Sequence, residues 1–406
     1  ITCRDWSSDV CSSDLSRVQQ SLGSGVIVTK DGYILTNNHV VDQADEIKVV
    51  LANGDKEYEA KLIGKDPQTD VAVLKVEATD LPAITIADSD LLKVGDVVLA
   101  IGNPFGVGQT VTMGIVGATG RGGFGVVQYE DFIQTDASIN QGNSGGALID
   151  ADGRLVGINT FILSPTGGNL GLGFAIPINM ARNVMSLLIG EGRVARGYIG
   201  VQLEAQVTPE LAREFKLSEP RGAIVTDVVE NTPGAKAGLK PGDVITQFNG
   251  RRVDDRRHLQ LMVSQTPPKT KVDLTVIRDG KERTVAVTLG EFPAGQFAGG
   301  QPESPDTSDA LRGVEVMDIT SQLRSQFSIP RNIEGALITG VDEESPSFEA
   351  GLRPGQVILE IDKRPVANAD DAVNLGRRVE GKTVLLRVWT PGGSRYVVVD
   401  TSQANP

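Results

Sequence analysis

The sequence predicts a mainly β protein, with a double β-barrel domain followed by two copies of a smaller α+β module. Aromatic residues make up 4% of the 406 residues, whereas glycine occurs 47 times among many valines and isoleucines, which is typical of strands joined by tight turns. Short apolar runs follow one another closely in the first half, and the second half contains an internal repeat. A hydrophobic content of 40% suits a soluble chain of about two to four domains.

The first half reads as two successive sets of short strands and a closing helix. Turn sequences such as Lys30-Asp31-Gly32 separate the strands, and this close spacing favours barrels. The first set is 25–29, 33–37, 47–51, 59–66 and 71–76, with further strands at 97–101 and 108–118; the second runs through Phe132, Ser144, 155–160 and 171–176. Apolar residues recur at helical spacing in 178–192, which predicts a helix there. This helix is expected to be the last element of the first domain, which comprises residues 16–192.

The second half repeats itself at a constant offset. Residues 222–226 match 335–339, and 237–242 match 350–355. Two copies are too few for a solenoid, so we expect two separate modules, 196–290 and 311–402. The stretch between them, 291–310, is rich in proline and glycine and is predicted to be a flexible linker.

The first fifteen residues differ from the rest of the chain. They hold both cysteines, Cys3 and Cys11, and show no hydrophobic period. A disulfide is one interpretation. The other is a non-native scar, because residues 5–15 back-translate into what looks like a sequencing-library adapter. In that case the native start, including the first barrel strand, is missing. The chain contains no apolar run of membrane-spanning length.

Three residues form a candidate catalytic set. Ser144 lies within the glycine-rich segment 142–146, which permits the sharp turn that a nucleophilic serine needs, although alone it also reads as a hairpin turn. His39 and Asp70 lie upstream, in the order that chymotrypsin-like folds use. Taken singly, each residue has a non-catalytic interpretation: His39 as a histidine in a turn, and Asp70 as an aspartate in the loop before a strand. The only other histidine, His258, follows two arginines on an apparently solvated helix, so His39 is the candidate general base.

These segments resemble one known family. The motifs at 23–27, 36–41, 100–106, 142–146 and 173–177 are similar to those of the HtrA family, the Deg-type serine proteases. The resemblance begins near residue 16 and continues to the end. It implies a chymotrypsin-like protease domain, with catalytic residues from both barrels facing a cleft, and two PDZ domains. It also implies a periplasmic location with a signal peptide, and a homotrimer or larger cage.

The resemblance assigns roles around Ser144. The backbone N–H groups of Gly142, Asn143 and Ser144 are expected to form the oxyanion hole. Ile139 is expected to wall the primary specificity pocket, where no acidic residue appears, so small aliphatic side chains are expected at the cleaved position. The loops 120–128 and 161–170 are glycine-rich, and we expect either switch segments that order and disorder or mobile surface turns.

The first PDZ module carries a candidate carboxylate-binding loop. Such loops follow the pattern X-Φ-Gly-Φ, which Tyr198, Ile199, Gly200 and Val201 satisfy. The second copy has Arg312 in place of the apolar residue, so we expect hydrophobic C-terminal peptides to bind only the first module. The alternative is that both modules serve only packing.

The sequence thus predicts an ATP-independent serine endoprotease that degrades unfolded or damaged polypeptides, with chaperone activity as a further expectation. The alternative is a catalytically silent PDZ chaperone or peptide-binding scaffold. No cofactor or metal is expected. The formal charge of −13 argues against nucleic acid as a general partner.

Overall fold

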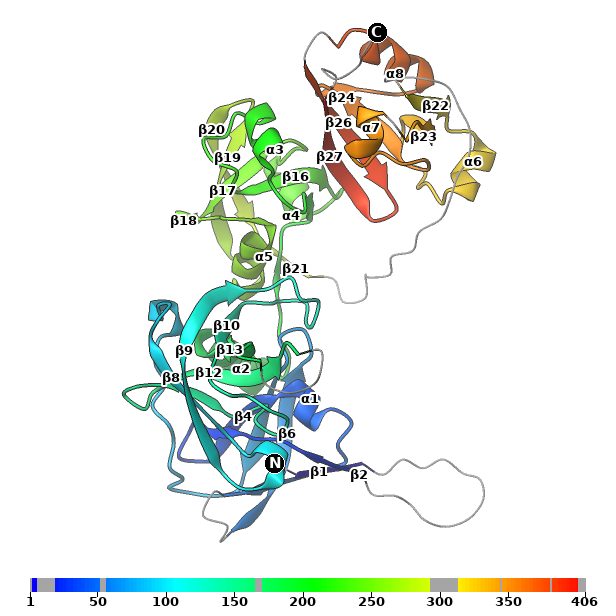
Figure 1. The fold of residues 1–406 in the computed structure, drawn as a ribbon. Helices are drawn as coiled ribbons and strands as arrows, with labels where there is room; N and C mark the ends of the chain where they lie inside the picture. Colours follow the sequence, from blue (N-terminus) through cyan, green and yellow to red (C-terminus); the bar gives the residue numbers. More distant parts are fainter. Residues whose placement is uncertain are drawn as a thin grey trace, which may run out of the picture. The chain divides into compact units, whose positions relative to one another are not determined.

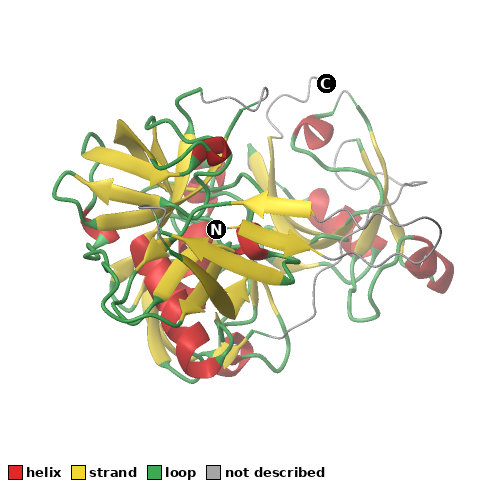
Figure 2. Ribbon diagram, turned by 90° about the horizontal axis from the view of Figure 1, so that it is seen from below, coloured by secondary structure: helices red, strands yellow, loops and turns green. Residues whose placement is uncertain are grey.

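The computed structural model describes residues 2–5, 19–51, 56–164, 170–292, 313–343, 345–379 and 382–400 (Figure 1). Strands predominate, as Figure 2 shows in yellow. The chain divides into two units, Ile1–Ala195 and Arg196–Pro406. Within the described residues, no helix is both long and apolar enough to cross a membrane.

The first half of the first unit is a seven-stranded sheet in the order β2-β1-β5-β6-β7-β4-β3. Its elements are β1 (Thr2–Asp5), β2 (Gln19–Leu22), β3 (Val26–Ile27), β4 (Tyr33–Asn37), α1 (Asn38–Val41), β5 (Glu46–Val50), β6 (Glu57–Asp66) and β7 (Val71–Val76). The sheet is open, with β2 and β3 at its edges, and between these two strands the Ser24 N–H donates to the Ser144 carbonyl in the second half at 2.8 Å.

Strand β7 organises this sheet. Val71, Ala72, Val73 and Leu74 are all fully buried, as the continuous apolar run predicts. The strand lies antiparallel to β4, so that Asn37 at the end of β4 pairs with Val71 at the start of β7. This register brings the residue after Asn37 and the residue before Val71 to the same edge of the sheet.

The second half of the unit is a closed barrel in the order β10-β13-β12-β11-β8-β9. Its elements, with the preceding 3-10 turn η1 (Ser89–Leu91), are β8 (Val97–Gly102), η2 (Pro104–Gly106), β9 (Thr110–Arg121), β10 (Phe132–Thr135), β11 (Ala147–Asp150), β12 (Leu155–Ile162) and β13 (Gly173–Pro177). The turn that carries Ser144 lies between β10 and β11. The closed barrel therefore presents this turn next to β12.

The helix α2 (Ile178–Glu191) follows the barrel and confirms the predicted helix. It packs on β6 and β7 of the first sheet and on β12 and β13 of the barrel. Ile178, Ala181, Val184 and Leu188 form the buried face that the apolar period predicts. The helix ends at Gly192, which has a φ of 69° and is a glycine C-cap. It thus joins the two halves into one unit.

The second unit confirms the internal repeat. Each module forms a six-stranded sheet with the same strand order, β15-β16-β17-β19-β20 with β18 beside β17, and β22-β23-β24-β26-β27 with β25 beside β24. A buried apolar cluster fills each module, around Ile245 in the first and around Ile358 in the second.

The elements of the first module are β14 (Gly197–Tyr198), β15 (Val201–Leu203), α3 (Pro209–Glu214), β16 (Ala223–Val228), α4 (Pro233–Ala237), β17 (Val244–Phe248), β18 (Arg251–Arg252), α5 (Arg256–Gln265), β19 (Lys271–Arg278), β20 (Lys281–Thr288) and β21 (Gly290–Glu291). The elements of the second are β22 (Val314–Asp318), α6 (Ser321–Gln326), β23 (Ala336–Val341), α7 (Pro346–Glu349), β24 (Val357–Ile361), β25 (Arg364–Pro365), α8 (Ala369–Gly376), β26 (Thr383–Thr390) and β27 (Gly393–Asp400).

The N-terminal segment differs from its prediction in one respect. Residues 2–5, where no strand period is visible, form β1, which pairs with β2 and β5. Cys11 lies outside the described residues, as does most of the linker 291–310. The scar, the missing native strand and the domain boundaries stay predictions.

Candidate active site

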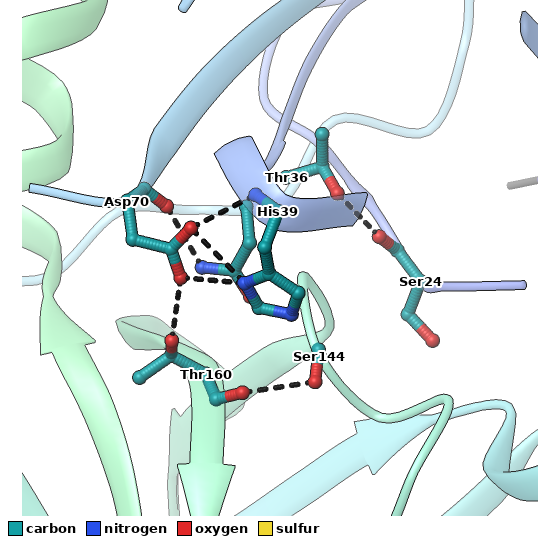
Figure 3. Close-up of polar contacts among 7 residues, drawn as sticks. Ser24, Thr36, His39, Asp70, Ser144 and Thr160 are labelled. Atoms are coloured by element: carbon teal, nitrogen blue, oxygen red, sulfur yellow. Dashed lines mark hydrogen bonds and ion pairs between the residues drawn. The ribbon is translucent and has the colours of Figure 1, made fainter. Parts of the chain in front are cut away.

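His39 lies at the start of α1, directly after β4. Its Nδ1 lies 2.8 Å from Asp70 Oδ2, and its backbone N–H donates to Asp70 Oδ1 at 3.0 Å. The side chain of His39 is 49% exposed, whereas that of Asp70 is 8% exposed. The ring is thus held on one side by a buried carboxylate and reaches solvent on the other (Figure 3).

Asp70 is held in place through its backbone. Its φ is 58°, in the left-handed region that aspartate tolerates better than most residues. Its carbonyl accepts hydrogen bonds from the Asn38 N–H at 3.1 Å and from Asn37 Nδ2 at 3.0 Å. These bonds hold the backbone of Asp70, and the bond from the His39 N–H to Oδ1 holds its carboxylate beside the His39 ring.

Thr160, on β12, connects Asp70 to Ser144, and the sequence analysis did not identify it. Its hydroxyl donates to Asp70 Oδ2 at 2.7 Å, and its carbonyl accepts the Ser144 hydroxyl at 2.9 Å (Figure 3). The residue is 3% exposed. The only signal in the sequence is a polar pair, Asn159-Thr160, inside an apolar strand. The structure thus brings His39, Asp70 and Ser144 into one hydrogen-bonded set.

The turn around Ser144 leaves two backbone donors free. Gly142 has a φ of 99°, and an added Cβ there would meet the backbone of residues 103–105, so glycine is required. The N–H groups of Gly142 and Ser144 have no partner among the residues that the structure describes. The Asn143 N–H instead donates to the Asn140 carbonyl at 3.0 Å. The expected oxyanion hole of Gly142, Asn143 and Ser144 stays a prediction, and Gly142 and Ser144 are its two members whose N–H groups lack a partner among the described residues.

Ile139 lies in the barrel core in this structure. It is 1% exposed and packs with Ile133, Leu148 and Val156. An added Cβ at Gly173 would lie 3.0 Å from its Cδ1, so the two residues are in close contact. Its role as a wall of the specificity pocket stays a prediction.

The candidate carboxylate loop of the first PDZ module also has free backbone donors. The carbonyl of Ile199 accepts the Gly234 N–H at 2.7 Å, and that of Gly200 accepts the Val229 N–H at 2.9 Å. Within the described residues, the N–H groups of Ile199 and Gly200 have no partner. Burial raises the pKa of the neighbouring Tyr198 phenol, so this side chain stays neutral near pH 7. The loop can therefore hold an anion through its backbone.

The corresponding loop of the second module is only partly described. Gly313 has a φ of 98°, close to the 85° of Gly200. Arg312 lies outside the described residues, so its side chain cannot be compared with that of Ile199. In the part of the chain that the structure describes, no group of three His, Cys, Asp or Glu residues is arranged to hold a metal ion.

Comparison with known proteins agrees with this geometry. Residues 23–158 match the trypsin-like peptidase domain family, and 197–289 and 337–390 match PDZ domain families. A probable periplasmic serine endoprotease DegP-like of Chlamydia trachomatis is 42% identical over 94% of this chain and 75% of its own length. The periplasmic serine endoprotease DegP of Escherichia coli is 44% identical over 86% of this chain and 70% of its own.

A solved structure is similar as well. The HtrA-type protease AlgW with decapeptide is 45% identical and has a TM-score of 0.60, covering 72% of this chain and 94% of its own. A trypsin-like domain, two PDZ domains and this level of identity over most of the length together assign the function. The chain belongs to the HtrA family, whose members named here are DegP-type periplasmic serine endoproteases.

Proposed function

We propose that this endoprotease cleaves peptide bonds with Ser144 as nucleophile, His39 as general base and Asp70 as the group that orients His39. The observation that carries the proposal is the continuous set of contacts from His39 through Asp70 and Thr160 to Ser144. A catalytically silent scaffold would have no use for this arrangement around a glycine-rich turn.

In this mechanism the Ser144 hydroxyl leaves the Thr160 carbonyl by rotating about its Cα–Cβ bond and donates to His39. His39 takes the proton as the hydroxyl oxygen attacks the peptide carbonyl, and Asp70 stabilises the resulting imidazolium. The negative charge on the carbonyl oxygen is stabilised by the N–H groups of Gly142 and Ser144. His39 then gives the proton to the leaving amine, and water hydrolyses the acyl-enzyme by the same steps in reverse order.

The biological setting is proposed from the relatives. Their printed names support a periplasmic location for this chain. We propose unfolded or damaged polypeptides as substrates, small aliphatic residues at the cleaved position, and a homotrimer or larger assembly, with chaperone activity in addition. The free N–H groups of Ile199 and Gly200 support binding of hydrophobic C-termini to the first PDZ module, and a similar structure contains a decapeptide.

Casein hydrolysis by the purified chain tests the catalytic proposal. We expect Ser144→Ala to lower the rate by about four or more orders of magnitude while the melting temperature stays nearly unchanged. Diisopropyl fluorophosphate should label Ser144 in the parent chain. Ser186→Ala, at an exposed position on α2, is the matched control and should retain both activity and labelling. Labelling of another serine, or hydrolysis by the Ser144→Ala variant, would contradict the assignment.

A further inference from the structure

Ser24 is a buried serine that the proposed chemistry does not use. It is 8% exposed and lies between β2 and β3, at the place where the chain leaves the first sheet. Its carbonyl accepts the Thr36 hydroxyl at 2.7 Å (Figure 3), which ties it to β4. Its remaining hydrogen bonds all go to the other half of the protease unit.

The hydroxyl of Ser24 acts as donor and acceptor at once. It donates to the Gly142 carbonyl at 2.7 Å and accepts the Asn103 N–H at 2.9 Å. The Ser24 N–H also donates to the Ser144 carbonyl at 2.8 Å. Because a hydroxyl can do both and a methyl group neither, the side chain of Ser24 joins the nucleophile turn to the segment that follows β8.

The two proposed oxyanion donors belong to peptides whose carbonyls are held by other residues. In a trans peptide the carbonyl and the N–H point in opposite directions, so a bond to the carbonyl also fixes the N–H. The peptide before Gly142 is held by a bond from the Phe105 N–H to the Gln141 carbonyl at 2.9 Å, and the peptide before Ser144 by a bond from the Gly146 N–H to the Asn143 carbonyl at 2.9 Å.

The peptide between these two, from Gly142 to Asn143, is held at both ends. Ser24 binds its carbonyl, and the Asn140 carbonyl accepts its N–H. The φ bond of Gly142 connects it to the peptide before it, and its ψ bond connects it to the peptide after it. Glycine restricts rotation about these bonds less than any other residue. Without the Ser24 hydroxyl, the peptide from Gly142 to Asn143 keeps only its bond to Asn140, and the Phe105 bond alone then holds the Gly142 N–H in convergence with that of Ser144.

We propose that Ser24 is a positioning residue for the oxyanion hole, acting through the Gly142 carbonyl. This inference rests on the proposed function. It predicts a defect that appears only once negative charge develops on the substrate oxygen, because the ground-state substrate gains little from these donors.

Ser24→Ala tests the proposal in the full chain. We expect kcat to fall about 10- to 100-fold, somewhat less than the loss of an oxyanion donor itself, with KM nearly unchanged and a lower melting temperature, because two buried hydrogen-bond partners lose the hydroxyl. A peptide boronic acid, whose tetrahedral adduct places an oxygen in the hole, should lose affinity by the same factor. Titration of the active site with diisopropyl fluorophosphate gives the fraction of molecules whose nucleophile reacts, and each measured rate is divided by this fraction.

Ser89→Ala is the matched control. Ser89 is also buried, at 7% exposed, and its hydroxyl accepts the Asn179 N–H at 3.2 Å, far from the nucleophile turn in the sequence. This variant should keep its kcat. An equal fall in kcat for Ser89→Ala, a Ser24→Ala defect confined to KM, or unchanged boronate affinity would show that Ser24 only stabilises the fold. If the parent chain itself did not hydrolyse the peptide, this result would contradict the proposed function and not the role of Ser24 specifically.

Discussion

Thr160 contacts two members of the proposed triad, and its hydroxyl is one of the donors to the Asp70 carboxylate. Thr160→Val keeps the shape of the side chain but removes this donor. Hydrogen bonds to charged groups contribute about 1.5 to 3 kcal/mol, so we expect kcat to fall about 10-fold or more. Steady-state peptide hydrolysis measures the effect. Thr160→Ser retains the hydroxyl and should stay near the parent rate; equal losses in both variants would assign the effect to packing instead.

A second residue-scale prediction concerns the buried ion pair of the first PDZ module. Asp243 is fully buried and accepts two bonds from Arg278, at 2.6 and 2.7 Å, which raise the pKa of the guanidinium. Asp243→Ala leaves the partly buried Arg278 guanidinium without its counter-ion, and among the described residues it then keeps only its bond to the Gly238 carbonyl at 2.8 Å. We expect the free energy of unfolding of this module to fall by about 3 to 5 kcal/mol. Hydrogen exchange of the backbone N–H groups in β17 and β19 measures this loss.

The repeat supplies the control for that experiment. Gln356 occupies the position of Asp243 in the second module, and it accepts only a neutral N–H, from Arg353 at 3.2 Å. Gln356→Ala should therefore cost about 1 kcal/mol. Similar losses in the two modules would show that the buried charge pair has no special role.

At the residue scale, the sequence could predict the triad because its members lie in distinctive local segments. Ser24 and Thr160 could not be identified as parts of the site. Both act through tertiary hydrogen bonds to residues distant in the sequence, and serine or threonine in a β-rich chain carries no signal of such a partner. The bond from the Asn143 N–H to the Asn140 carbonyl could not be predicted either, because a sequence pattern does not show which way a peptide points in a tight turn.

At the element scale, the loop between β9 and β10 is organised by one carboxylate. Glu130, 4% exposed, accepts the N–H groups of Gly123, Phe124, Val126 and Val127. The same loop contacts both sides of the site. The Tyr129 N–H donates to the Gln68 carbonyl, two residues before Asp70, and the Phe124 ring lies 6.0 Å from that of Phe161, next to Thr160.

Glu130→Gln should loosen this loop, because an amide replaces one acceptor oxygen by a donor that faces other N–H groups. We expect faster hydrogen exchange at 123–127. We also expect a several-fold lower kcat, because the loop contacts Phe161, next to Thr160, and Gln68, two residues before Asp70. Hydrogen-exchange mass spectrometry and peptide hydrolysis measure the two effects. Glu191→Gln, exposed at the end of α2, is the control. Faster loop exchange with unchanged kcat would rule out coupling between loop and site.

Most elements of the first unit could be predicted from short apolar runs between turn sequences, including β4, β7 and α2. Strands β8 and β9 were expected with the first set, but they pair with β11 and β10 in the closed barrel, and apolar runs do not show which sheet a strand joins. Strand β11 was missed because Ala147-Leu148-Ile149 follows the glycines of the nucleophile turn without a break, so the pattern gives no boundary. Strand β1 was missed because its place comes from backbone pairing with β2 and β5, which its sequence does not indicate. Of the loop 161–170, residues 165–169 lie outside the described residues.

At the scale of the whole molecule, the internal repeat predicted two modules of one fold, and their identical strand order confirms it. What the repeat could not show is whether both modules bind peptide. Gly200 and Gly313 share a left-handed backbone, and Thr232 and Ser345 occupy equivalent places beside them. These glycines agree in backbone conformation, so the expected difference in binding is predicted from the residue types at positions 199 and 312.

We therefore predict that a peptide with a free hydrophobic C-terminus binds the first module only. Its carboxylate would accept the N–H groups of Ile199 and Gly200, and its backbone would pair beside β15. Fusing this tail to an unfolded substrate should lower KM with little change in kcat, because tethering raises the local substrate concentration without altering the chemistry at Ser144. Calorimetry on the full Ser144→Ala chain measures binding, and digestion of tailed and untailed casein peptides measures KM.

Gly200→Ala and Gly313→Ala form a matched pair for this prediction. An added Cβ would clash with Thr232 in the first module and would lie 2.8 Å from the Ser345 Cβ in the second, and both glycines have positive φ, so both substitutions strain their loops. Only Gly200→Ala should abolish binding and the KM effect. Amidating the C-terminus of the peptide should also abolish binding, because it removes the negatively charged carboxylate that the N–H groups of the loop bind. If Gly313→Ala weakened binding equally, or the amidated peptide bound as tightly, recognition would not occur at the loop from Tyr198 to Val201.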